Sequence, residues 1–137
     1  MKKIIFWLVM LILVKSVVST LEITEVMYDF PGDDDYHEFI EIYSYSLVNL
    51  SGFIIGDSSS NDTLEMQQFY PGEYSLIVEG GFNYSGLNNS IYSAGKTIGN
   101  NLNNDKDAIY FYYPNGTLVD FVFYNSSMGA KGNHKTL

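Results

Sequence analysis

The sequence predicts an all-β domain, built as a β-sandwich of about seven or eight strands. Apolar and polar residues alternate in several short segments, the pattern of strands with one buried and one exposed face. Turn signals separate these segments at short intervals, as they do in sandwiches. After residue 20 no segment carries apolar residues at helical spacing over several turns, and 137 residues suffice for one domain.

Three strands are expected in the first part of the chain, at residues 21–28, 38–43 and 50–55. The segment 30–35 (FPGDDD) separates the first two strands, because proline and glycine end strands and adjacent like charges need water. The third segment closes on a glycine, and a polar turn is expected over residues 57–62.

The middle of the chain carries weaker signals. A weak strand is expected at residues 63–69, a turn at 70–73 (YPGE) and a clear strand at 74–78. A long loop then runs from residue 80 to residue 90. Residues 91–98 are expected to hold at most a short edge strand.

The segments 108–113 and 117–124 are predicted to pair as a hairpin around Asn115 and Gly116, since both residues tolerate positive φ. On the second strand, the face of Phe121 and Phe123 has no charge, whereas the other face carries Asp120. We therefore expect Phe121 and Phe123 to point inward, where they meet Ile109 and Phe111. The outward aromatic residues would be Tyr110, Tyr112, Tyr113 and Tyr124. These rings would pair across the hairpin, or else stack on sugars or pack on a partner.

Residues 1–19 are predicted to be a signal peptide, and residues 20–137 the mature domain. Lys2 and Lys3 precede an apolar core of about eleven residues, and small or modest side chains before Ser19 suit cleavage after it. The alternative is an uncleaved membrane anchor, which would bury Lys15 at a cost unless its ammonium reaches the interface.

The composition is acidic and lacks cysteine. The net charge is −9, and without the leader four lysines stand against sixteen acidic residues, a net charge of −12. Such a surface repels nucleic acid and anionic lipid, so no direct binding of nucleic acid is expected. Without cysteine, neither disulfides nor thiolate chemistry is available. We expect a secreted or cell-surface protein that relies on its core.

Six short motifs, in order, resemble the lamin tail domain family in the form found on exported prokaryotic proteins. They are residues 23–28 (ITEVMY), 38–43 (EFIEIY), 48–53 (VNLSGF), 71–74 (PGEY), 104–109 (NDKDAI) and 115–120 (NGTLVD). The resemblance implies an immunoglobulin-like sandwich without common catalytic machinery, which binds or anchors. Phe53 stands where the family usually has tryptophan. Residues 134–137 resemble the start of the family's closing segment, which leaves a minimal domain and a truncated chain as alternatives.

Carboxylates within strands are candidates for structural roles. Glu25 and Glu41 lie on faces that also carry apolar residues, and Glu38 opens the second strand. A carboxylate among apolar neighbours is costly unless it is hydrogen-bonded, so we expect these groups to accept backbone N–H groups or to lie at an exposed edge. A cation site is the alternative.

Acidic loops are candidates for calcium, which prefers six to eight oxygen ligands. No spacing matches an EF-hand, and solvated loops are the default interpretation of such runs. The candidate ligands are Asp33, Asp34, Asp35, Asp57, Asp105 and Asp107. No other cofactor is expected.

No catalytic pattern is present: His37 and His134 lack zinc-ligand spacing, and no Gly-x-Ser-x-Gly motif occurs. Six sequons mark candidate sites for glycans if the host glycosylates exported proteins. They begin at Asn49, Asn61, Asn83, Asn88, Asn115 and Asn125.

The sequence thus predicts an exported, non-enzymatic module that binds a protein or a surface glycan, or anchors at the cell surface. The alternatives are a calcium-stabilised or carbohydrate-binding module and an accessory part of a truncated secreted nuclease or hydrolase. A direct membrane contact is expected only if the leader is retained.

Overall fold

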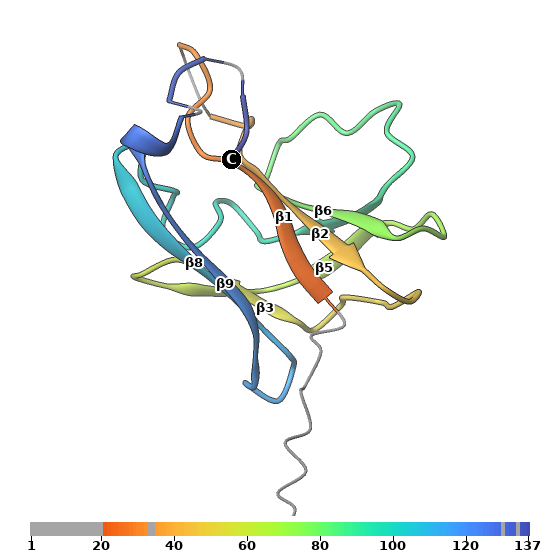
Figure 1. Cartoon of the computed structure of the whole chain (residues 1–137). Coiled ribbons are helices and arrows are strands. Elements are labelled where there is room, and N and C mark those ends of the chain that lie inside the picture. The colour runs from red at the N-terminus through yellow and green to blue at the C-terminus, as the bar shows by residue number, and fades with distance from the viewer. Residues whose placement is uncertain (1–20, 33–34, 130, 134) are drawn as a thin grey trace, which may run out of the picture.

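Two β-sheets pack face to face in the computed structural model, which describes residues 21–32, 35–129, 131–133 and 135–137 (Figure 1). The strands are β1 (Leu21–Met27), β2 (Phe39–Ser44), β3 (Ile54–Gly56), β4 (Asn61–Thr63), β5 (Glu65–Gln68), β6 (Tyr74–Val78), β7 (Ser90–Ser93), β8 (Lys106–Tyr112) and β9 (Leu118–Asn125). One 3₁₀ turn, Ser126–Met128, follows β9. The prediction of an all-β, immunoglobulin-like sandwich is confirmed.

The predicted signal peptide lies outside the described residues. Within the described part of the chain, no helix has the length and apolar character that a membrane crossing requires.

The first sheet has the strand order β1-β2-β6-β7-β5. The prediction of at most a short edge strand within residues 91–98 was wrong, because β7 lies inside the sheet, parallel to β6 and antiparallel to β5. Ile91 packs in an apolar cluster on the outer face of the sheet and Tyr92 in the core on its inner face, so both are fully buried and no alternation of apolar and polar residues marks this strand.

The second sheet has the order β4-β3-β8-β9. The weak strand expected at residues 63–69 is in fact two short strands, β4 and β5, which belong to different sheets. The chain changes sheets at Leu64, which is buried and whose backbone exchanges hydrogen bonds with Gly52 and Phe53. The predicted hairpin is confirmed: β8 and β9 pair antiparallel, and Gly116 takes a φ of +80° in the turn between them.

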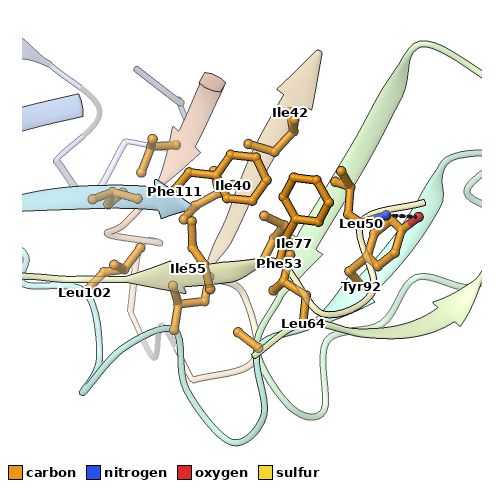
Figure 2. Packing of buried hydrophobic residues seen from close by; sticks show 14 of the residues in the cluster. Ile40, Ile42, Leu50, Phe53, Ile55, Leu64, Ile77, Tyr92, Leu102 and Phe111 are labelled. Atoms are coloured by element: carbon orange, nitrogen blue, oxygen red, sulfur yellow. Dashed lines mark hydrogen bonds between the residues drawn. The ribbon is translucent and has the colours of Figure 1, made fainter. Parts of the chain in front are cut away.

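One hydrophobic core fills the space between the sheets (Figure 2). Inward side chains of both sheets, such as Ile40 and Phe111, meet there with residues of the connecting loops, such as Leu50 and Phe53. The hydroxyl of Tyr92 accepts the backbone N–H of Leu50 at 3.0 Å, so the one polar atom of this buried ring is paired (Figure 2).

A smaller apolar cluster lies on the outer side of the first sheet. The loop between β6 and β7 folds back over Leu76, Val78 and Ile91 and contributes Phe82, whose ring lies 6.0 Å edge-on from that of Phe39. The end of the first sheet that carries Phe39 and Val78 is therefore covered on both faces. The loop leaves the outer face at the opposite end of the sheet uncovered.

The edge strands β1 and β9 of the two sheets meet through Asp120. Its Oδ2 atom accepts the backbone N–H of Ile23 at 2.9 Å, next to the irregular register of β1 between Ile23 and Glu25. Further along β1, Leu137 and Val26 exchange two backbone hydrogen bonds, and Leu137 packs against the core. The edge of β1 that does not pair with β2 is thus held at two points, by Asp120 and by Leu137.

The side chains of β9 face the opposite way from the prediction. Asp120 points toward β1, so Val122 and the fully buried Tyr124 also turn inward, and Ile109 pairs with Val122. The prediction that Phe121 and Phe123 point inward was wrong: their side chains are 59% and 52% exposed. The burial of Ile109 and Phe111 is confirmed.

Candidate interaction surface

The outer face of β8 and β9 carries a row of aromatic side chains. Tyr110 pairs with Phe121 across the hairpin, and their rings are stacked with centroids 6.2 Å apart. Tyr112 lies one step along β8, with its ring 6.3 Å from that of Tyr110. Phe123 pairs with Ala108 beside them. The interpretation of cross-strand pairing is therefore confirmed for Tyr110, and the binding of a sugar or a partner stays a prediction. Two phenyl groups, those of Phe121 and Phe123, are largely in water.

Tyr124, expected outward, instead secures the inner side of the same hairpin. Its ring stacks on that of Tyr28 at 4.2 Å, and its hydroxyl donates to the backbone carbonyl of Asn103 at 2.9 Å. Burial strongly raises the pKa of the Tyr124 hydroxyl, which keeps it a neutral donor. The hairpin that carries the aromatic row is thus held on its inner side by this ring stacking and this hydrogen bond.

The calcium candidates that the structure describes do not gather at one place. Asp57 is buried, and its Oδ1 atom accepts the backbone N–H groups of Ser59 and Ser60 at 2.6 and 2.7 Å. Its Oδ2 atom accepts that of Asn100 at 2.7 Å. Asp57 therefore joins two polar loops through its carboxylate. Asp62, in the same acidic loop as Asp57, accepts the N–H of Gly99 at 2.6 Å, and burial raises its pKa.

Asp107 lies close to these loops. Its Oδ1 atom accepts the hydroxyl of Ser58 and the N–H of Ala108, both at 2.8 Å. Asp105 is exposed and forms an ion pair with Lys131 at 2.5 Å, which lowers the pKa of Asp105. Asp35 is exposed, and Asp33 and Asp34 lie outside the described residues.

Of the three glutamates that the sequence singled out in strands, only Glu38 is buried, and it lies directly before β2. Glu41 accepts the hydroxyl of Thr24 at 2.8 Å, and Glu41 and Glu25, which pair across β1 and β2, are both half-buried. The two buried groups are Glu38 and Glu79. Glu79 accepts the backbone N–H of Glu38 at 2.9 Å, and Glu38 that of Leu102 at 3.3 Å.

Sequence reasoning missed the structural role of Glu79. Burial raises the pKa of its carboxyl group, although backbone N–H groups, that of Glu38 foremost, act in the opposite direction. The only signal was its place at the end of an otherwise apolar strand, directly before Gly80 and Gly81.

Calcium binding remains a prediction. Among the described residues no cluster of three or more His, Cys, Asp or Glu side chains is arranged to hold a metal ion. Of the candidate carboxylates, Asp107 alone lines the polar hollow of about 430 Å³ between Ser59 and the loop of residues 100–104.

If this hollow takes calcium, millimolar calcium chloride should raise Tm above the value in sodium chloride of equal ionic strength, because a ligand of the native state stabilises it by mass action. Calorimetry in both salts measures the difference, and Asp107→Asn should abolish it. Equal Tm values in the two salts would contradict the prediction.

The predicted glycan sites lie mostly on open surface. Asn125 is half-buried and caps the 3₁₀ turn, where its side chain accepts the N–H of Ser127. The other five sequon asparagines are exposed: Asn49, Asn61, Asn83, Asn88 and Asn115.

A family model, Lamin Tail Domain, matches residues 15–126. Comparisons with curated proteins and with solved structures found no match. The matched range contains all of β1 to β9, and thus both sheets and the aromatic row.

Proposed function

The chain belongs to the lamin tail domain family, and we propose that it is an exported, non-enzymatic module that binds a protein or a glycan at the cell surface through the aromatic row on β8 and β9. The family consists of immunoglobulin-like domains without catalytic function, which supports a binding role. The acidic composition and the leader-like first nineteen residues support export.

The exposure of Phe121 and Phe123 carries the proposal. Burying a phenyl group contributes roughly 1.5–3 kcal/mol to folding, yet both rings stay largely in water. Large exposed apolar patches are uncommon on monomers and mark surfaces that bind partners. The rings of Tyr110, Tyr112 and Phe121 are stacked nearly parallel along the row, with interplanar angles of 17° and 19°. Such exposed aromatic surface can pack on a sugar or on an apolar protein patch.

The experiment is a pull-down from the native surface fraction with three purified proteins. Wild type should retain a partner, and the double variant Phe121→Ser, Phe123→Ser should retain at least tenfold less, because each ring would be buried in the complex. Phe69→Ser is the matched control, since Phe69 is 44% exposed on the other sheet's edge. Equal capture by both variants would refute the role of the row.

Two pretreatments of the surface fraction identify the partner class. Protease should abolish capture if the partner is a protein, whereas glycosidase should abolish it if the partner is a glycan. The export part of the proposal has its own readout: mass spectrometry of the exported protein should find a mature N-terminus at about Thr20. An intact Met1 in the membrane fraction would favour an anchor instead.

A further inference from the structure

Three tyrosines and two glutamates form a second exposed patch, on the outer face of the first sheet. Glu22 of β1, Tyr43 of β2 and Tyr74 of β6 lie in one row across the strands. Tyr45, just after β2, and Glu73, just before β6, complete the patch. We call these five residues the tyrosine–glutamate patch. It lies at the end of the sheet that the loop between β6 and β7 leaves uncovered.

The three rings differ in orientation and gather around Tyr43. The centroid of Tyr45 lies 4.9 Å from that of Tyr43 at an interplanar angle of 90°, and that of Tyr74 lies at 5.0 Å and 61°. Tyr45 and Tyr74 are 59% and 46% exposed. The patch therefore presents aromatic surface in several directions around the ring of Tyr43.

The two carboxylates accept hydrogen bonds from the hydroxyl groups of two of these rings. Glu73 accepts the hydroxyl of Tyr43, and Glu22 that of Tyr45, each at 3.2 Å. A carboxylate has about four acceptor positions, so each glutamate retains capacity for a further donor. The charge of Glu22 raises the pKa of Tyr45, and desolvation followed by the hydrogen bond to Glu73 raises the pKa of Tyr43.

Among the residues that the structure describes, no lysine forms an ion pair with Glu22 or Glu73, and the one ion pair is that of Lys131 with Asp105. The sequence contains no arginine, and its net charge is −9. Aromatic faces attract cations within about 6 Å, and guanidinium groups also form paired hydrogen bonds with carboxylates. Ring surface and unneutralised carboxylates in one patch are complementary to such a group.

We propose that the tyrosine–glutamate patch binds an arginine side chain from a basic segment of a partner protein. The guanidinium group stacks on the tyrosine rings and donates hydrogen bonds to Glu22 and Glu73. Arginine suits the patch better than lysine because its planar, weakly hydrated group both stacks and donates in a fork. The patch lies on the sheet opposite the aromatic row, so the two surfaces can be occupied independently.

The test is an NMR titration of the purified protein, with tyrosine rings labelled, against the capped peptide Gly-Arg-Gly-Arg-Gly. Ring signals of Tyr43, Tyr45 and Tyr74 should shift together and saturate, and affinity should fall as sodium chloride rises. The same peptide with citrulline in place of arginine keeps the shape and lacks the charge, and it should leave the signals in place. A lysine peptide should bind several-fold more weakly. Equal binding of the lysine peptide would overturn the guanidinium assignment.

Substitutions locate the site. Glu22→Gln combined with Glu73→Gln should reduce the affinity about tenfold, and so should Tyr45→Ala combined with Tyr74→Ala. Glu65→Gln and Tyr70→Ala alter exposed residues outside the patch and should leave the affinity unchanged. Circular dichroism checks that every variant is folded. An equal loss in Glu65→Gln would reduce the effect to non-specific attraction and overturn the proposal, as would the absence of shifts at millimolar arginine peptide.

Discussion

Phe111→Ala is expected to lower the free energy of unfolding by about 3–5 kcal/mol, the usual cost of removing a buried phenyl group. Phe111 is fully buried in the second sheet, and its ring stacks on that of Phe53 at 5.4 Å. Alanine would leave a cavity where both sheets contribute side chains (Figure 2). The loss is a large part of the roughly 5–15 kcal/mol by which a domain is usually stable.

Phe121→Ala is the matched control, since it removes the same phenyl group from the outer face of the same hairpin. It should change the free energy of unfolding by less than about 1 kcal/mol, because water already surrounds most of the ring. Urea denaturation followed by circular dichroism measures both variants, with equal m-values as the check that the two transitions are comparable. A loss at Phe121 as large as that at Phe111 would show that another surface covers the outer face.

Asp57→Ala is expected to cost about 3 kcal/mol, although Asp57 lies in a polar loop. Three backbone N–H groups lose a charged acceptor, and hydrogen bonds to charged groups contribute about 1.5–3 kcal/mol each before water replaces part of the loss. Asp57→Asn should also destabilise, because an amide nitrogen then faces one of these N–H groups. Asp105→Ala removes an exposed carboxylate and should change little.

A double-mutant cycle with Gly99 separates the loop contact from general damage. A methyl group built on Gly99 would overlap the carboxylate of Asp57, and the φ of +61° also favours glycine there. Gly99→Ala should therefore be much less destabilising in the Asp57→Ala background than in wild type. Strictly additive losses would mean that the loops of residues 57–60 and 99–100 are not coupled through this carboxylate.

Much of the architecture follows from local pattern. Strands β1, β2 and β6 and the hairpin of β8 and β9 were all predictable, because alternation and turn residues depend only on neighbours in the chain. The order of six short motifs indicated the lamin tail domain family, which the family model confirms. For the candidate sites, composition identified acidic loops and surface tyrosines, but no local cue indicates which carboxylate accepts which N–H.

Tertiary structure alone decided the remainder. β7 is an inner strand only because β6 and β5 flank it, and residues buried on both faces carry no alternation. The faces of β9 were predicted wrongly because the face that carries the charge of Asp120 was expected to point outward. The backbone N–H of Ile23, 97 positions away in the chain, is the partner of this carboxylate. Asp120 thus shares the inner face of β9 with Val122 and Tyr124, and Phe121 and Phe123 point outward because successive side chains of a strand point to opposite faces.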